Sequence, residues 1–335
     1  MTATEQTTTM SVREALRLAL HEELERDERV FLLGEEIGLF EGSYRVTAGL
    51  LEEFGEQRVR DTPISEEGFV GAAIGAAMAG GRPVVEIMTV NFSLLAMDQI
   101  VNNAAKIHYM FGGEAGCPIV VRTPGGGGSQ LTAQHSQSFD AWFAHVPGLK
   151  VLAPATPADA KGLLKAAIRD DDPVLFLESF PLYNTKGDVS EDPDAVEPIG
   201  RARVAREGTD ITIVAHSFAV VHALRVAEHL ADQNDVTAEV IDLRSLRPLD
   251  FDTVAGSVAK TNRALCVEEG WATYGVTAEI AARISCACFD DLDAPVHRVG
   301  AAEVPLPYAK NLEQAALPGE EKIIAAARTV LGLNA

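Results

Sequence analysis

The sequence predicts an α/β protein of two domains, each a mostly parallel sheet flanked by helices, and three observations predict this class. Short runs of β-branched residues alternate with longer helical patterns along the whole chain. These runs are nearly continuous in Val, Ile and Leu, which is typical of parallel strands covered on both faces. The chain has 335 residues. Ordinary domains have roughly 150 residues, so two domains are expected.

The order of these patterns predicts the elements of each domain. The predicted strands are residues 30–33, 84–88, 119–122, 150–153, 174–177, 211–215, 238–243 and 264–267. The predicted helices are residues 11–27, 68–79, 95–109, 157–169, 219–232, 250–260, 275–286 and about 320–331. Apolar periodicity stops at residues 186–198, where five acidic residues, one lysine and two prolines predict a solvated linker. The predicted domains are therefore residues 8–185 and 199–335.

Composition and charge exclude several classes of function. Hydrophobic residues make up 47% and charged residues 23% of the chain, as in globular proteins. No apolar run approaches the roughly 18 to 20 residues that span a bilayer. The formal net charge of −21 repels phosphate backbones and anionic lipid, so neither a nucleic-acid nor a membrane-surface role is expected. Four cysteines are too few for a disulfide framework in a chain of this length.

The first ten residues are polar and rich in threonine, and none of them is basic. They resemble neither a secretory signal nor an Arg-rich transit peptide. A cytoplasmic bacterial protein is the simplest expectation, although a processed organellar protein would look the same.

The glycine run at residues 125–128 does not form a known phosphate-binding motif. It lacks the lysine and the spacing of a P-loop, and it does not complete a Gly-x-Gly-x-x-Gly fingerprint. No Gly-x-Ser-x-Gly nucleophile elbow occurs either. Spacing alone therefore gives no reason to expect a nucleotide site.

Glu66 is the first candidate site residue. It follows the extended segment 59–64 at the start of a helix rich in small residues, where free amide groups and the helix dipole favour a carboxylate. Glu67 is its neighbour, and helical geometry points the two side chains about 100° apart. One of them can face solvent and the other a cleft, but spacing cannot choose between them.

His135 is the second candidate. It follows the glycine run and stands among amide and hydroxyl side chains in the segment 132–137. A His on a flexible loop is a plausible general acid or base, although an exposed loop His is more often inert. His216 and His222 lie in or beside the start of an apolar helix, and we expect packing or capping roles for both.

Several short motifs in fixed order resemble one family. They are DTPISE at 61–66, MTVNFS at 88–93, QHSQ at 134–137, PGLKV at 147–151, DAKGL at 159–163 and VPLPYA at 304–309. Together they resemble the beta subunits of the decarboxylating component of pyruvate dehydrogenase complexes, within the thiamine-diphosphate-dependent 2-oxo acid dehydrogenases. The resemblance runs from about Val12 to the C-terminus.

The resemblance implies a transketolase-like pyrimidine-binding domain followed by a transketolase C-terminal-like domain. In this family the alpha subunit holds the diphosphate and Mg²⁺ through a Gly-Asp-Gly motif, and that motif is missing from this sequence. Thiamine diphosphate would therefore lie across the interface between alpha and beta subunits. This chain would supply only the aminopyrimidine end of the site.

The resemblance also implies roles for individual residues. Glu66 would hydrogen-bond N1′ of the aminopyrimidine and so favour removal of the thiazolium C2 proton. Phe92 would pack against the pyrimidine ring, which is compatible with a core position. His135 would face the lipoyl-lysine channel and donate a proton during acyl transfer. A potassium site built largely of backbone carbonyls maps to Ile119, Ala167, Ile168, Asp170 and Asp172, where the last position is commonly Asn in the family.

The implied function is decarboxylation of a 2-oxo acid, with transfer of the acyl group to the lipoyl group of a dihydrolipoyl acyltransferase core. The beta subunit would act only with its alpha subunit, in an alpha2–beta2 heterotetramer. The TPISE and TVNFS segments favour pyruvate as substrate over branched-chain 2-oxo acids, and acetoin dehydrogenases are also similar. Two alternatives of other kinds are a non-catalytic docking subunit and a thiamine enzyme that works without a partner.

Overall fold

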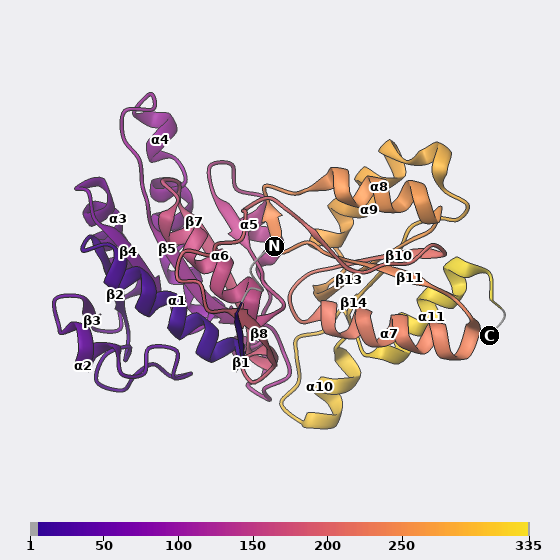
Figure 1. Cartoon of the computed structure of the whole chain (residues 1–335), viewed down its shortest axis with the longest axis horizontal. Coiled ribbons are helices and arrows are strands. Elements are labelled where there is room, and N and C mark those ends of the chain that lie inside the picture. The colour runs from indigo at the N-terminus through magenta and orange to yellow at the C-terminus, as the bar shows by residue number, and fades with distance from the viewer. Residues whose placement is uncertain (1–5, 334–335) are drawn as a thin grey trace. The chain divides into compact units, whose positions relative to one another are not determined.

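The computed structural model of the chain describes residues 6–333, which form two compact units (Figure 1). The first unit contains the residues up to Gly125 together with Trp142–Ile199, and the second contains Gly126–Ala141 together with the residues from Gly200 onward. The division after residue 199 lies at the end of the predicted linker. However, Gly126–Ala141, which the sequence places in the first domain, groups with the second unit, where the Gly128 and Gln130 amides donate to Glu313.

The first unit is built on a sheet of parallel strands. Its strands are β2 (Val30–Gly34), β3 (Val59–Asp61), β4 (Arg82–Glu86), β5 (Val120–Gly125), β6 (Lys150–Leu152) and β7 (Val174–Ser179). They lie in the order β6-β7-β5-β4-β2-β3, and each adjacent pair is parallel. The carboxyl ends of all these strands therefore meet at one edge of the sheet.

The helices of the first unit are α1 (Val12–Arg26), α2 (Leu50–Phe54), α3 (Glu66–Met78), α4 (Ile107–Met110), α5 (Asp140–Ala144, which crosses into this unit) and α6 (Pro157–Arg169). Two of them, α1 and α6, begin at recognisable local signals. A capping box starts α1, since Ser11 and Glu14 each bind the other's backbone amide. Thr156 caps α6, and Pro157 occupies its first turn. The two helices pack against each other.

The single helix predicted at 95–109 is wrong. The chain instead forms the 3-10 segment η1 (Val90–Ala96), the π-helical segment η2 (Gln99–Ala104) and the short α4. Within η2, the side-chain amide of Asn103 donates to the backbone carbonyl of Asp98, the residue before this segment, at 3.4 Å. Side-chain bonds of this kind compete with the regular i to i−4 ladder, and apolar spacing does not reveal them.

The predicted linker begins with a strand. β8 (Lys186–Ser190) pairs antiparallel with β1 (Thr7–Ser11), and both belong to the first unit. Val189 is only 1% exposed, whereas its neighbours in β8 are polar or glycine. A two-stranded ribbon on the surface needs few buried side chains, so neither β1 nor β8 carries the apolar pattern of a buried strand. The short η4 (Phe180–Leu182) precedes this strand.

A buried ionic cluster connects the middle strands of the first unit. Arg122 on β5 is 1% exposed and donates to Glu178 on β7 through Nε and Nη2, each at 2.8 Å. Its Nη1 donates to Glu86 on β4. The Tyr183 hydroxyl donates to Glu178 Oε2 at 2.6 Å. Burial raises the pKa of Glu86, and the positive charge of Arg122 opposes that rise.

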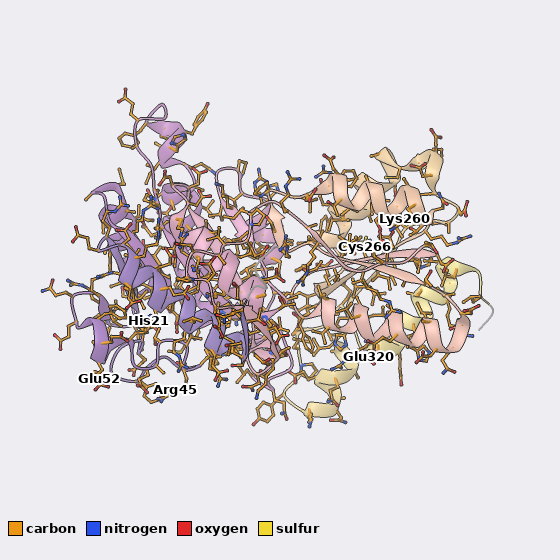
Figure 2. The ribbon with its side chains drawn as sticks, in the orientation of Figure 1. His21, Arg45, Glu52, Lys260, Cys266 and Glu320 are labelled. Atoms are coloured by element: carbon orange, nitrogen blue, oxygen red, sulfur yellow. The ribbon has the colours of Figure 1, made fainter. Side chains whose placement is uncertain are left out.

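The second unit contains a mixed sheet with helices on both faces. The strands of this unit are β9 (Arg203–Arg206), β10 (Ile211–Ala215), β11 (Ala238–Asp242), β12 (Ser245–Arg247), β13 (Ala264–Trp271) and β14 (His297–Ala301). Five of them lie in the order β14-β13-β10-β11-β9, where only β9 is antiparallel to its neighbour. Cys266 on β13 is fully buried in this sheet (Figure 2).

Helices cover this sheet in two pairs. They are α7 (Ala219–Asn234), α8 (Phe251–Thr261), α9 (Val276–Ala287), α10 (Lys310–Ala316) and α11 (Glu320–Leu331), with short 3-10 turns at η3 (Ala133–His135) and η5 (Phe289–Asp291). α8 packs against α9 on one face and α7 against α11 on the other (Figure 1). Glu320 of α11 accepts from Arg225 of α7 at 3.1 Å. Within residues 6–333, no helix is both long and apolar enough to cross a membrane.

The cluster around Arg122 yields a test of stability. Arg122→Met should lower the free energy of unfolding by about 3 to 5 kcal/mol, because Glu86 and Glu178 would remain buried without their cation. Arg45→Met removes an exposed arginine paired with Glu41 and should cost no more than about 1 kcal/mol. Urea unfolding curves of the two variants measure the difference. Equal costs would show that the buried cluster contributes no more than a surface ion pair.

Candidate functional site

Three side chains follow adjacent parallel strands at the carboxyl edge of the first unit's sheet. Glu35 comes directly after β2, Glu66 follows β3, and Phe92 follows β4. β2 lies between β3 and β4 in the sheet. Open α/β sheets bind ligands outside the carboxyl ends of their strands. This edge is therefore the candidate functional site.

Glu66 is the first residue of α3 and is 4% exposed, whereas Glu67 is exposed. The structure thus shows which of the two adjacent glutamates faces solvent, which helical spacing could not decide. At this position the positive end of the helix dipole favours a negative charge. Within residues 6–333 the Glu66 carboxylate forms no hydrogen bond or ion pair, so it is buried and still free to bind a ligand.

Phe92 lies half-buried in η1, which packs directly against α3. Local bonds hold this turn in place. The Phe92 amide donates to the Thr89 carbonyl at 2.9 Å. The Asn91 side-chain amide donates to Thr89 Oγ1 at 2.7 Å, and Ser93 Oγ donates to the Val90 carbonyl at 2.5 Å. The structure therefore brings the predicted Phe92 and Glu66 together on two packed elements.

Glu35 is a candidate site residue that the sequence analysis missed. It is 5% exposed, and its Oε1 is buried without a hydrogen-bond partner within residues 6–333. Burial, with the negative charges of Glu66 and Glu36, raises the pKa of Glu35 to about 7. A carboxyl group with such a pKa can hold or release a proton near neutral pH. The sequence contained a signal for Glu35, because this residue lies two positions after the predicted strand 30–33, near the carboxyl edge of the sheet.

His135 belongs to the second unit. It ends the 3-10 turn η3, is half-buried, and its backbone amide donates to the Thr132 carbonyl at 3.1 Å. Thr132 has a φ of 64°, which is uncommon for a β-branched residue and marks a tightly constrained loop. His216 is buried as expected, with Nε2 3.6 Å from Asp140 Oδ1 in the same unit.

The residues predicted to bind potassium gather near the C-terminal end of α6. The Ile168 and Asp170 carbonyls both accept from Arg82 Nη1, at 3.0 and 2.9 Å. The Asp170 and Asp172 carboxylates bind the Lys150 ammonium. The Ile119 carbonyl accepts from the Val174 amide and the Ala167 carbonyl from the Asp170 amide. These carbonyls and carboxylates therefore already bind donors of the same chain, and two of the donors, Arg82 and Lys150, are cations.

Exposed apolar side chains surround the carboxyl edge. They are Leu39 and Phe40 after β2, Ile64 before α3, and Leu94 and Leu95 on η1. Three further exposed residues, Tyr109, Met110 and Phe111, lie on or just after α4. Large apolar side chains concentrated around one site are typical of a surface that another protein covers.

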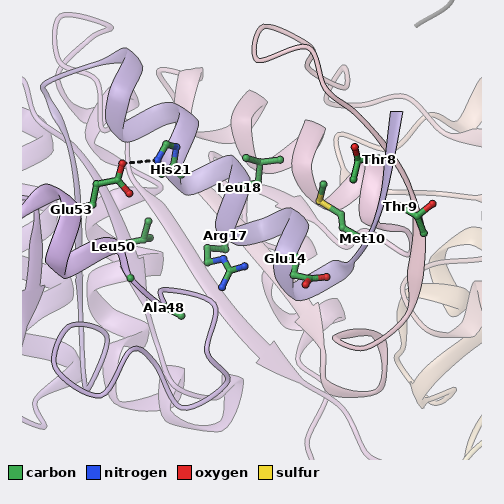
Figure 3. Close-up of a pocket in the computed structure, with 11 residues that line it drawn as sticks. Thr8, Thr9, Met10, Glu14, Arg17, Leu18, His21, Ala48, Leu50 and Glu53 are labelled. Carbon is green, nitrogen blue, oxygen red and sulfur yellow. Dashed lines mark hydrogen bonds and ion pairs between the residues drawn. The ribbon is translucent and has the colours of Figure 1, made fainter. Parts of the chain in front are cut away.

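A separate pocket of about 510 Å³ lies in the first unit among α1, β1 and the residues before α2 (Figure 3). The predicted site residues do not line it. His21 Nε2 lies 2.8 Å from Glu53, and Nδ1 lies 3.6 Å from Glu25. The three side chains are close enough to hold a metal ion. Because both ring nitrogens of His21 already face a carboxylate, we interpret the cluster as a connection between α1 and α2.

Comparisons with known proteins agree with this architecture. Residues 8–186 match the transketolase pyrimidine binding domain, and residues 200–323 match the transketolase C-terminal domain. A pyruvate dehydrogenase E1 component subunit beta from Rickettsia felis is 54% identical over 96% of this chain and 98% of that protein. The mitochondrial counterpart from Dictyostelium discoideum is 50% identical over 100% of this chain and 94% of that protein.

A solved structure shares the fold. It is described as a split gene transketolase, an inactive beta4 tetramer, and matches with a TM-score of 0.77 over 97% of this chain and 99% of that chain. The two sequences are 24% identical, so this likeness concerns the fold alone.

The raised pKa of Glu35 predicts how stability depends on pH. The folded chain holds the Glu35 proton up to about pH 7, whereas an ordinary Glu loses it near 4.5. Between these values the folded state binds more protons, so the free energy of unfolding should fall as the pH rises from about 4.5 to 7. Glu35→Gln should remove up to about 3 kcal/mol of this fall.

Urea unfolding curves at pH 5 and pH 8 measure this effect. Glu52→Gln, which removes an exposed carboxylate of α2, is the control and should keep the pH dependence of the original chain. If Glu35→Gln also kept it, Glu35 would have an ordinary pKa.

Proposed function

This chain belongs to the family of pyruvate dehydrogenase E1 component beta subunits, and from that membership we propose that it forms one half of a thiamine-diphosphate-dependent pyruvate dehydrogenase. The observation that carries the proposal is the buried, unpaired Glu66 at the carboxyl edge, beside Glu35 and Phe92. The relatives at 50 to 54% identity are named for pyruvate, which supports pyruvate over branched-chain 2-oxo acids or acetoin.

The residues of this edge fit the aminopyrimidine end of thiamine diphosphate. When bound, the cofactor supplies the nucleophilic carbon and the electron sink for loss of CO₂ from a 2-oxo acid. Glu66 would share a proton with N1′ of the pyrimidine, and its burial excludes water that would compete for that bond. Glu35 would hold a proton close to Glu66 at neutral pH. Phe92 would pack against the ring.

An alpha subunit would complete the site. The sequence contains no Gly-Asp-Gly motif, so we propose that the alpha subunit holds the diphosphate and Mg²⁺. The exposed apolar residues beside Glu35, Glu66 and Phe92 support a protein partner on this edge. We propose an alpha2–beta2 heterotetramer that is active only when both chains are present.

We further propose a role for His135 in the second half of the reaction. Imidazole can donate a proton near neutral pH, and His135 lies on a constrained loop. His135 would donate a proton while the acyl group passes reductively to the lipoyl group of a dihydrolipoyl acyltransferase. The same acyltransferase core would bind the assembled enzyme.

A non-catalytic docking subunit is the alternative of another class. In that case the fold would serve only to bind the alpha subunit and the acyltransferase. A carboxylate with ordinary surface exposure would suit this role, whereas Glu66 is 4% exposed and Glu35 has a raised pKa. These features are costly to keep without a chemical use, and they favour the catalytic proposal.

Replacement of Glu66 tests the proposal directly. Glu66→Gln keeps the size of the side chain but removes the proton that it shares, so decarboxylation of pyruvate by the reconstituted enzyme should fall at least about 100-fold. Glu67→Gln, on the exposed neighbour, should keep normal activity. An assay of CO₂ release with an artificial electron acceptor measures the rate, and size-exclusion chromatography checks the assembly. Near-normal turnover of an intact Glu66→Gln enzyme would favour the docking subunit.

The proposed potassium site predicts a stabilising effect of the ion. K⁺ at ten times its dissociation constant should add about 1.4 kcal/mol to the free energy of unfolding. That corresponds to a rise of about 3 °C in Tm. Thermal unfolding in potassium chloride, compared with tetramethylammonium chloride at equal ionic strength, measures the effect. Identical Tm values would show that Asp170, Asp172 and the nearby carbonyls bind no K⁺.

A further inference from the structure

The loop that begins with the glycine run, which matched no phosphate-binding motif, binds an anion that belongs to the protein itself. Gly126 has a φ of +84° and Gly128 a φ of +93°, which residues with a side chain rarely adopt. With this backbone the amides of Gly128 and Gln130 both point at the Glu313 carboxylate. Both donate to Oε1 at 3.0 Å, and Gln130 also lies 3.3 Å from Oε2. Hydrogen bonds to an ionised acceptor are stronger than neutral ones.

Glu313 is held firmly on its own side of this contact. It lies on α10 and is 1% exposed. Within residues 6–333, Glu313 forms no ion pair. Its carboxylate accepts from the backbone amides of Gly128 and Gln130. Gly127 packs closely beside them, because a Cβ at that position would lie 2.7 Å from Leu306 and 2.9 Å from Leu317. A polar anchor and an apolar contact therefore fix the first half of the loop.

The second half of the loop is fixed as well. The Gly126 amide donates to the Gln137 carbonyl at 3.1 Å, which closes the base of the loop. Asp140 lies 3.6 Å from the buried His216. In the sequence, His135 lies between Gln130, which binds Glu313, and Gln137, which binds Gly126. Its position therefore depends on contacts that residues 126–141 make within the second unit.

We propose that Glu313 is a positioning residue that orders residues 126–141 and thereby places His135 for transfer of the acyl group. The proposal rests on the function proposed above for His135. The loop that starts with the glycine run serves this purpose. Phosphate-binding loops aim backbone amides at a ligand, whereas the amides of Gly128 and Gln130 bind a buried carboxylate of the same chain.

Hydrogen–deuterium exchange of the assembled enzyme tests the anchor. In Glu313→Ala, peptides that cover residues 126–137 should exchange at least about tenfold faster, because two amides lose their acceptor. In Glu313→Gln the side-chain carbonyl still accepts, so the increase should be smaller. Glu321→Gln, on an exposed residue of α11, is the matched control and should leave exchange unchanged. Unchanged exchange in Glu313→Ala would overturn the anchor.

A double-mutant cycle tests whether the anchor acts through His135. The measured rate is reductive acylation of a free lipoyl domain, compared with decarboxylation measured with an artificial acceptor. Glu313→Ala should lower the ratio of acylation to decarboxylation at least about tenfold, and Glu313→Gln should restore part of it. Glu313→Ala combined with His135→Ala should be no slower than His135→Ala alone.

The outcomes separate the two proposals. An additive loss in the double variant would overturn the positioning role of Glu313 even if the loop exchanges faster. Normal acylation by His135→Ala alone would overturn the function proposed for His135, whereas the exchange result would still decide whether Glu313 anchors the loop.

Discussion

Arg122 lies buried between Glu86 and Glu178, and this contact constrains three adjacent strands at once. A buried cation without its carboxylates would cost several kcal/mol, so β4, β5 and β7 are held in one register. The segments that leave these strands then start from fixed positions. η1 with Phe92 follows β4, and the glycine run begins at Gly125, the last residue of β5. The geometry of the candidate site depends on this alignment.

The same edge concentrates negative charge where water is scarce. Glu35 and Glu66 interact there, and burial together with Glu66 and Glu36 raises the pKa of Glu35 to about 7. Two buried carboxylates in one place are unfavourable unless a proton or a ligand relieves their repulsion. The apolar residues on the surrounding loops are equally unfavourable in water. The proposed cofactor would relieve the repulsion between the two acids, and the proposed alpha subunit would cover the apolar side chains.

The alternation of strands and helices could be predicted because it is a local property. Buried strands and amphipathic helices carry their periodicity in neighbouring residues, and α6 and α11 have the predicted bounds. The prediction of strands failed where a segment distant in the sequence stabilises the strand. β8 exists because β1 pairs with it from about 180 residues away. The predicted helix at 95–109 changes its hydrogen-bond pattern at η2, where the Asn103 side chain donates to the Asp98 backbone carbonyl.

The sequence by itself determined the fold class and the family, because these follow from local periodicity and short motifs, and the same motifs make Glu66 and Phe92 candidate site residues. Only the tertiary structure decided that Glu66 is buried and Glu67 exposed. Helical spacing points the two side chains in different directions but does not say which direction faces solvent. Glu35 became a candidate site residue only when parallel pairing placed β2 beside β3. The amide of Gly128, the last residue of the glycine run, donates to Glu313, which lies 185 residues further along the chain. The physical reason is common to all three: burial and charge depend on neighbours in space, which no local pattern specifies.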